Sequence, residues 1–257
     1  MSRLSRFNIG VAEIIDPYPV LYIPEIDTVV VSDLHLGYEG VMAEEAGVFI
    51  PKVQFEKEMH IIREVTEGLK ARRIVLNGDV KHEFSETSYH ETRELSELLE
   101  YLQNRYGEVI LVKGNHDNYI IRVTGRYGVE LVEEYQAGRY YFIHGHFIPE
   151  RFESKGEVVI IGHEHPAVVL YDEIGAREKI PCLLHGHTLD GRKIIVLPPM
   201  SIFAQGNEVN IIPKNELLSP ILREYVDIDE LEVIAVSQEA GCIKFPKLKI
   251  LRTAAAR

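Results

Sequence analysis

The sequence predicts an α/β fold in which two β-sheets pack face to face with helices on the outside. In the first half of the chain, short runs of β-branched residues alternate with helical patterns. After Tyr106, strand-like segments follow one another with short turns. No repeat or low-complexity linker divides the 257 residues, so we expect one domain over residues 1–257.

The predicted core strands are continuous apolar runs, a pattern typical of strands that are buried on both faces. Each run ends in polar residues, and a glycine stands next to most of these ends. The runs cover residues 28–31, 73–76, 109–112, 140–143 and 158–161.

Two helices are predicted between the first three of these strands. One begins near Pro51, a favoured first-turn residue, and keeps apolar side chains at a 3.6-residue period from Phe55 to Leu69. The other covers roughly residues 86–106, with an inward-facing row of leucines and Gly107 at its end. Both apolar stripes are interpreted as core positions rather than cofactor-binding motifs.

The second half is predicted to be mostly β. Strand-like segments fall at roughly 129–135, 139–144, 157–162, 167–172, 177–185 and 192–197. Residues 198–257 are expected to extend the same domain, with a strand near 208–212, a short helix near 219–224 and a strand at 231–236. The basic stretch from Lys244 to Arg257 contains no Asp or Glu, and we expect a solvated tail there rather than a partner-binding arm.

Composition argues against several classes of protein. Apolar residues make up 46% and charged residues 26% of the chain, unlike a disordered or fibrous protein, and no apolar run is long enough to span a membrane. Forty acidic residues against 28 basic residues give a formal charge of −12, so bulk non-specific binding of DNA is not expected. With two distant cysteines and no apolar leader, we expect no disulfide, no thiolate zinc site and a cytoplasmic location.

Clusters of Asp, Asn and His follow the predicted core strands, at the point where each strand ends. Because the carboxyl ends of strands in open α/β sheets line the binding crevice, we expect one shared site. Each fragment alone is a weak signal, whereas the ordered set is hard to produce by chance. The clusters are Asp33-Leu34-His35, Gly78-Asp79, Gly114-Asn115-His116-Asp117, His144 and Gly162-His163-Glu164-His165.

These residue types indicate a site for two divalent metal ions. Alternation along an extended segment puts Asp33 and His35 on the same side, where both can bind one ion. Asp79 has two carboxylate oxygens and can bridge two cations that lie about 3.5–4 Å apart. Nitrogen and oxygen ligands without thiolate suit Mn²⁺, which we expect, or Fe²⁺ or Zn²⁺. The remaining ligands, an amide oxygen and three imidazoles, come from Asn115, His144, His163 and His165.

The ordered series of motifs from Asp33 to His165 resembles that of the calcineurin-like metallophosphoesterase superfamily. The resemblance implies a four-layer α/β/β/α sandwich of two mixed sheets flanked by helices, with a dinuclear metal centre. In such a centre His116, next to a ligand, matches the family's catalytic histidine. The implied ligands are Asp33, His35, Asp79 and His165 for one metal, and Asp79, Asn115, His144 and His163 for the other.

One departure from the family pattern is informative. Many phosphatases of the superfamily carry Gly-Asp-x-x-Asp, whereas this chain has Gly-Asp-Val-Lys-His at residues 78–82. A histidine there is similar to the branch that contains double-strand-break repair exonucleases, and we expect His82 near the substrate phosphate or leaving group; the alternative is a solvated loop histidine. Segments 77–84, 162–166 and 197–201 look like archaeal and bacterial phosphoesterases associated with DNA ligase or helicase. The resemblance thus implies a link to DNA repair, ligase or helicase partners, and a homodimer.

The predicted activity is metal-dependent hydrolysis of phosphate esters. Two divalent ions lower the pKa of a shared water, and the resulting metal-bridging hydroxide attacks the phosphorus. His116 is predicted to protonate the leaving group. We expect a phosphodiesterase, acting on a nucleotide or as a nuclease on nucleic acid; the alternatives are a phosphomonoesterase or protein phosphatase, and a metal-bound interaction scaffold. His146 is expected at the rim of the site, and His185 and His187 stay unassigned.

Overall fold

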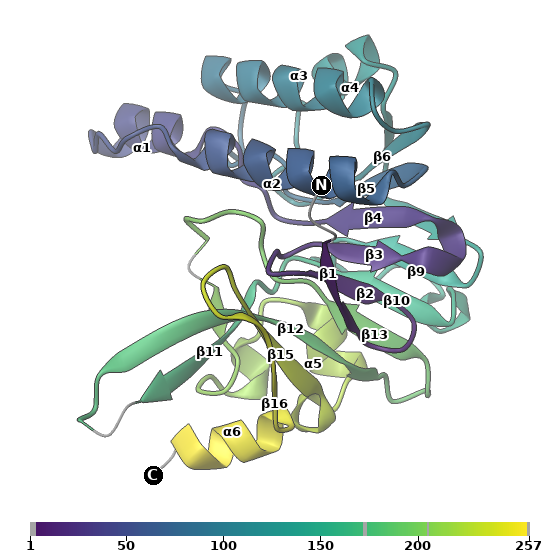
Figure 1. The fold of residues 1–257 in the computed structure, drawn as a ribbon, viewed down its shortest axis with the longest axis vertical. Coiled ribbons are helices and arrows are strands. Elements are labelled where there is room, and N and C mark those ends of the chain that lie inside the picture. The colour runs from purple at the N-terminus through teal and green to yellow at the C-terminus, as the bar shows by residue number, and fades with distance from the viewer. Residues whose placement is uncertain (1–3, 172–173, 205, 256–257) are drawn as a thin grey trace.

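The computed structural model describes residues 4–171, 174–204 and 206–255, and it has an α/β fold of two mixed sheets flanked by helices (Figure 1). Helices α1 to α4 lie over the outer face of the first sheet, and helices α5 and α6 lie beyond the second sheet. The predicted fold class is therefore confirmed. None of the helices in the described part of the chain is long and apolar enough to span a membrane.

The first sheet has seven strands in the order β1-β2-β3-β4-β5-β6-β7. Strands β4 to β7 run parallel, whereas β1 to β4 pair antiparallel. The three N-terminal strands are not among the predicted ones, because their short runs mix polar and apolar residues. The strands are β1 (Ser5–Asn8), β2 (Glu13–Asp16), β3 (Leu21–Ile23), β4 (Thr28–Val31), β5 (Arg73–Asn77), β6 (Glu108–Val112) and β7 (Glu130–Val132).

The second sheet has nine strands. Seven follow the order β14-β11-β12-β13-β10-β9-β8, and β15 pairs with both β12 and β16. Strands β9, β10 and β13 are parallel. The strand predicted near 208–212 shrinks to two residues followed by a turn. The strands are β8 (Glu134–Ala137), β9 (Tyr140–Ile143), β10 (Val158–Ile161), β11 (Pro166–Tyr171), β12 (Arg177–His187), β13 (Lys193–Val196), β14 (Asn207–Glu208), β15 (Glu232–Ser237) and β16 (Gly241–Phe245).

The observed helices agree with the predicted ones where the 3.6-residue apolar pattern continues over several turns. Helix α3 begins at Tyr89 rather than near residue 86, because the Ser88 hydroxyl accepts a hydrogen bond from the Glu91 N–H while the Glu91 carboxylate accepts one from the Ser88 N–H. Helices α1, α4 and α6 are additional to the predicted ones. The helices are α1 (Tyr38–Ala46), α2 (Gln54–Leu69), α3 (Tyr89–Gln103), α4 (Ile121–Arg126), α5 (Pro220–Tyr225) and α6 (Leu248–Ala255).

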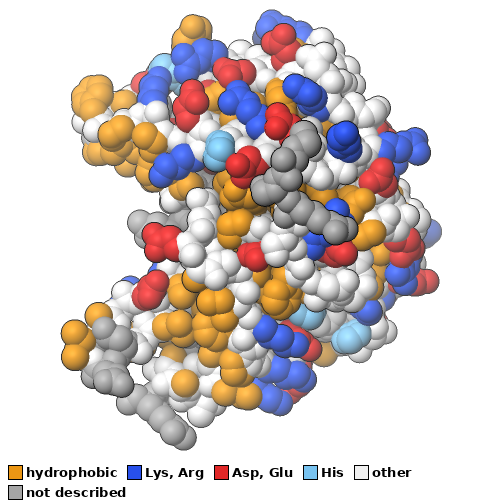
Figure 2. Space-filling view, in the orientation of Figure 1, with side chains coloured by type: hydrophobic (Ala, Val, Ile, Leu, Met, Phe, Trp, Pro, Cys, Tyr) orange, Lys and Arg blue, Asp and Glu red, His pale blue; other side chains and the backbone are white. Residues whose placement is uncertain are grey.

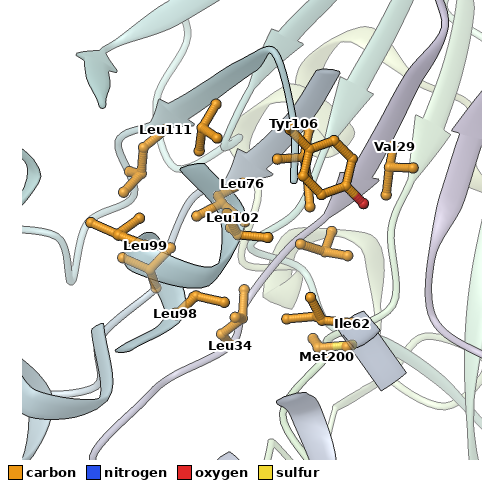
Figure 3. Packing of buried hydrophobic residues seen from close by; sticks show 14 of the residues in the cluster. Val29, Leu34, Ile62, Leu76, Leu98, Leu99, Leu102, Tyr106, Leu111 and Met200 are labelled. Carbon is orange, nitrogen blue, oxygen red and sulfur yellow. The ribbon is translucent and has the colours of Figure 1, made fainter. Parts of the chain in front are cut away.

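Alternate residues of the central strands face different cores. Val29 and Val31 of β4 pack against α2 and α3 in the core drawn in Figure 3, whereas Val30 faces the space between the two sheets. In the second sheet, Tyr140 faces the first sheet and Tyr141 faces the layer of α5 and α6. Because both faces of each central strand are buried, the apolar runs are continuous rather than alternating.

The C-terminal stretch is not the solvated tail that its charge suggested. It forms β16 and α6, and Leu248 of α6 is fully buried in the outer core of the second sheet. Three of its cations are engaged within the chain: Lys247 and Lys249 both contact Glu230, and the Arg252 guanidinium donates hydrogen bonds to backbone carbonyls. Arg257 lies outside the described residues. The prediction was wrong because α6 is short and its amphipathic period spans barely two turns.

The surface carries charges of both signs. On the face drawn in Figure 2, Lys and Arg side chains lie among Asp and Glu side chains. Hydrophobic side chains gather where α1 projects, and Val48 and Phe49, which follow α1, are exposed. This face shows no broad basic region, which agrees with the acidic net charge.

Glu58, on α2, has a fully buried carboxyl group. Burial raises the pKa of Glu58 well above its usual range, and the carboxylates of Glu39 and Glu94 raise it further. The unfolded chain ionises this group above about pH 4.3 while the folded chain keeps it protonated, so stability falls as pH rises, by up to ~1.4 kcal/mol per pH unit. Glu58→Gln is therefore expected to be more stable than the wild type at about pH 8 and to lose that advantage near pH 4. Urea denaturation of both proteins at each pH checks this, and an equal difference at both pH values would contradict it.

Candidate metal centre

The predicted ligand residues meet at one edge of the two sheets. The parallel strands β4, β5 and β6 of the first sheet and β9 and β10 of the second end at this edge. A contact between His165, after β10, and Asp33, after β4, joins the two sheets there. The strand ends are followed by Asp33 and His35, by Asp79, by Asn115 and His116, by His144, and by His163 and His165.

A first group of possible metal ligands consists of Asp33, His35, Asp79 and His165, whose ligand atoms all lie within 4.8 Å of one another. His165 Nε2 lies 2.8 Å from Asp33 Oδ1 and 3.4 Å from His35 Nε2. The four residues match the set that the resemblance implies for one metal.

A second group consists of Asp79, His144 and His163, within the same 4.8 Å. His144 Nδ1 donates a hydrogen bond to the Asn77 carbonyl, which leaves Nε2 facing Asp79 Oδ2 at 3.1 Å. Asp79 belongs to both groups, as a bridging ligand must. The amide oxygen of Asn115, the remaining predicted ligand, is buried, and its chain neighbours Gly114 and His116 both lie against Asp79.

The residues at this edge fit a pair of cations. Two of their buried atoms, His35 Nδ1 and Asn115 Oδ1, have no hydrogen-bond partner among the described residues, and His144 Nε2 has only its contact with Asp79. A buried polar atom without a partner costs roughly 1–3 kcal/mol, so such atoms cluster where something else satisfies them. Carboxylate, amide and imidazole donors without thiolate are the ligands of Mn²⁺, Fe²⁺ and Zn²⁺.

The backbone is strained at the ligands themselves. Five of the predicted ligands have φ between 46° and 61°, a left-handed conformation that residues other than glycine rarely adopt. Hydrogen bonds from Asp33 N to the Gly78 carbonyl and from His35 N to the Asp79 carbonyl hold two of these turns. Strain of this kind persists where the surrounding structure enforces it, and it is concentrated at functional sites. The five are Asp33, His35, Asp79, His163 and His165.

Glycines beside the clusters leave room for the ligands. A Cβ on Gly114 would lie 2.1 Å from Asp79 Oδ1, and a Cβ on Gly78 would lie 2.2 Å from His144 Nδ1. Any side chain at these positions would therefore push a ligand aside. This accounts for the glycines that accompany the polar clusters in the sequence.

The sequence profile of the calcineurin-like phosphoesterase family matches residues 26–191, which include every member of both groups. The chain belongs to this family. Among solved structures, the Pseudomonas putida nuclease MPE is similar to it at a TM-score of 0.61 and 16% identity, over 94% of this chain and 100% of that chain. A Vps29 mutant from Entamoeba histolytica (TM-score 0.38, 13% identity, 85% and 99% coverage) and a predicted phosphoesterase from Streptococcus pneumoniae (0.32, 16%, 85% and 95%) are also similar. Among curated proteins, none matches the sequence.

In this calcineurin-like phosphoesterase the two aspartates among the predicted ligands, Asp33 and Asp79, are ionised. Burial raises the pKa of Asp33, but His165 outweighs burial and lowers the pKa to about 2. Asp79 is buried as well, and the facing His144 likewise holds its pKa below the usual range. Ionised carboxylates are the form that binds a cation.

The imidazoles divide into two kinds. Burial lowers the pKa of both His35 and His163 to about 3, so these rings are neutral and have a lone pair to offer. Burial also lowers the pKa of His144, but Asp79 outweighs it and raises the pKa to about 9. A cation bound by Asp79 would displace that proton, because a metal ligand must be deprotonated.

The His116 side chain lies beside the two ligand groups that share Asp79, but it belongs to neither of them. Its backbone N–H donates to Asp79 Oδ1 at 2.9 Å, and its Nε2 lies 3.8 Å from Asp79 Oδ2. Its Nδ1 donates to the His82 carbonyl, so Nε2 is the atom that faces the centre. The ring of Phe84 covers the imidazole at 3.6 Å between centroids.

His82 is not a solvated loop histidine. Its ring lies 5.4 Å from that of His35, 5.7 Å from that of His116 and 4.6 Å from that of Tyr38. The nitrogens of His35, His82 and His116 form a third group close enough to hold an ion. Burial, followed by the nearby His116, lowers the pKa of His82 to about 4.

Asp117 is the site residue that sequence reasoning left without a role. It is buried, and its carboxylate accepts hydrogen bonds from the backbone N–H groups of Asp79, Val80 and Gly114. It therefore clamps the turn that carries Asp79. Burial and the neighbouring Asp79 raise the pKa of Asp117. Its place in Gly-Asn-His-Asp was visible in the sequence. Its role was not, because an acceptor of backbone N–H groups needs no particular residue types or spacing around it.

The other histidines differ in their distance from the centre. The His146 ring lies 5.4 Å from that of His144 and 6.0 Å from that of His163, and the residue is half-buried. His185 and His187 lie on β12, where they pair with Ile195 and Lys193 of β13. His187 thus faces the start of β13, whereas the centre lies at the opposite end of the parallel strands.

Proposed function

We propose that this metal-dependent phosphoesterase is a phosphodiesterase that cleaves nucleotides or nucleic acid, and that it acts as a nuclease. The observation that carries the proposal is the position of His116: it lies beside the residue shared by both ligand groups, with Nε2 facing the centre. Aromatic rings border the same place, since Tyr38 stacks on Phe203 at 5.0 Å and Phe84 lies on His116. Such rings can stack on nucleobases. The name of the P. putida protein, a nuclease of similar fold, supports this substrate class.

Each group of residues has its own part in the proposed reaction. The seven predicted ligands would hold two divalent ions, which would supply a nucleophile at neutral pH and neutralise phosphate charge. His116 donates a proton from Nε2 to the departing oxygen, because Nδ1 is engaged by the His82 carbonyl. The His82 side chain orients the phosphate or the leaving group by hydrogen bonding. Asp117 keeps Asp79 in place throughout.

We also propose the finer assignments that accompany this function. The nitrogen and oxygen ligands support Mn²⁺ as the native ion. Contacts of residues 198–257 with both halves, such as Met200 N–H to the Ser32 carbonyl, support one domain over residues 1–257. Two free cysteines support a cytoplasmic location. A role in DNA repair, a DNA ligase or helicase partner, and a homodimer rest on the resemblance of the motifs.

Hydrolysis of bis-p-nitrophenyl phosphate, p-nitrophenyl phosphate and single-stranded DNA, measured with Mn²⁺ added, tests the proposal. We expect kcat/KM to be higher for the diester than for the monoester, and the DNA to be cleaved. Hydrolysis of the monoester alone would instead identify a phosphomonoesterase or protein phosphatase. Bound ions without hydrolysis of any of the three would identify an interaction scaffold.

A further inference from the structure

A hollow of about 770 Å³ lies between α4 and the loop that follows His82. The loop side is lined by Ser85, Glu86 and Thr87, and the other side by Tyr119, Arg122 and Arg126. None of these residues belongs to the ligand groups or to the proposed proton donor.

The hollow is attached to the centre through two neighbouring residues. Phe84 packs on the ring of His116 and is directly followed by Ser85 of the hollow. Asn118 donates hydrogen bonds to the carbonyls of Phe84 and Asn115, and it is directly followed by Tyr119 of the hollow. The two walls of the hollow therefore follow directly, in the sequence, two residues that contact His116 or the carbonyl of Asn115.

Two guanidinium groups that line the hollow have no anionic partner among the residues that the structure describes. Arg122 and Arg126 lie one helical turn apart on α4, both are exposed, and neither makes an ion pair within the described part of the chain. Lys113, the cation that directly follows β6, is by contrast paired with Glu133. Glu86 is the one carboxylate among the lining residues, so the hollow has a net positive charge in a protein whose formal charge is −12. Free guanidinium groups are suited to phosphate.

Tyr119 presents an aromatic face at the same place. Its side chain is 70% exposed, and its φ of 67° is in the left-handed region, which is costly for a residue of this size. The loop that carries Asn115 and His116 thus holds the ring in solvent rather than in a core. Stacking of an unpaired base on an aromatic ring stabilises binding of single strands.

We propose that this hollow binds the nucleotide adjacent to the scissile phosphate in a single-stranded nucleic acid. Arg122 and Arg126 bind the next phosphate of the strand, and Tyr119 stacks on the base. The inference rests on the proposed phosphodiesterase function and deepens it: the substrate is a strand with consecutive phosphates rather than an isolated nucleotide.

The test compares the double variant Arg122→Ala/Arg126→Ala with the wild type on three substrates. For bis-p-nitrophenyl phosphate and for a thymidine dinucleotide, which have one phosphate each, we expect kcat/KM to stay within about twofold. For a thymidine oligonucleotide we expect kcat/KM to fall about tenfold or more. The dependence of log kcat/KM on log salt concentration should become shallower by about 0.7 for each phosphate that the double variant no longer binds.

Matched variants separate the subsite from a general change of charge. Arg72→Ala/Arg105→Ala removes the same charge at the opposite edge of the first sheet, before β5 and β6, and should leave all three rates unchanged. Tyr119→Ala should lower the oligonucleotide rate about tenfold, whereas Tyr119→Phe, which keeps the ring, should not. Wild-type oligonucleotide rates in the Arg122→Ala/Arg126→Ala variant would overturn the subsite and leave the phosphodiesterase intact. A wild type that cleaves no diester would overturn both.

Discussion

Replacing His116 with alanine is expected to lower kcat for a nucleotide diester about 10²- to 10⁴-fold while two metal ions stay bound. The proton donor is removed, but neither ligand group that contains Asp79 includes the His116 side chain. The contact of His116 with Asp79 Oδ1 comes from the backbone N–H, which alanine keeps. Steady-state kinetics, together with the metal content of the dialysed protein, checks both halves of this expectation.

The dependence of the His116→Ala rate loss on the leaving group shows whether His116 is the proton donor. p-Nitrophenolate departs without protonation at neutral pH, whereas a nucleoside alkoxide does not, so the fall in rate for His116→Ala should be smaller with the p-nitrophenyl ester. A positioning role for His116 would lower both rates alike. His185→Ala, which removes a histidine on β12 that lies next to Glu232, is the matched control and should keep wild-type rates. Near-normal turnover of nucleotide diesters by His116→Ala would remove the proton-donor assignment.

The central strands and the meeting of the polar clusters could be predicted from the sequence for one physical reason. A parallel strand buried on both faces needs a continuous apolar run, and the run of β4, for example, ends where Asp33 begins the site. Five runs of this kind end in ligand-type residues at one edge, so their order alone brings Asp33, Asp79 and His163 together.

Other features depend on partners that are distant in the sequence. The left-handed turn at His35 is held by a backbone hydrogen bond to the Asp79 carbonyl, which is distant in the sequence, and no local pattern of the sequence specifies it. Strand β1 pairs only at the edge of the first sheet, and α6 is amphipathic for barely two turns. The clamp that Asp117 provides consists of backbone N–H groups, which every residue except proline supplies.

Asp79→Asn is expected to have the second large effect on activity. It should act by weakening metal binding rather than by removing the proton donor of the leaving group. Asp79 is the residue that the group with His165 and the group with His144 share, and it lies buried against His144. Asparagine keeps the shape and an oxygen that can accept from the His116 N–H, but it removes the negative charge that faces two cations. We expect both ions to bind at least about a hundredfold more weakly and kcat/KM to fall with them.

Ligands that belong to only one of these two groups provide the comparison that tests the bridge. His35→Ala affects only the group with Asp33 and should remove one ion, and His163→Ala affects only the group with His144 and should remove the other. Metal content measured across added Mn²⁺ should therefore show one strong site in each single-group variant and none in Asp79→Asn. If Asp79→Asn keeps one strong site, Asp79 serves a single ion, and the two groups are independent sites rather than one dinuclear centre.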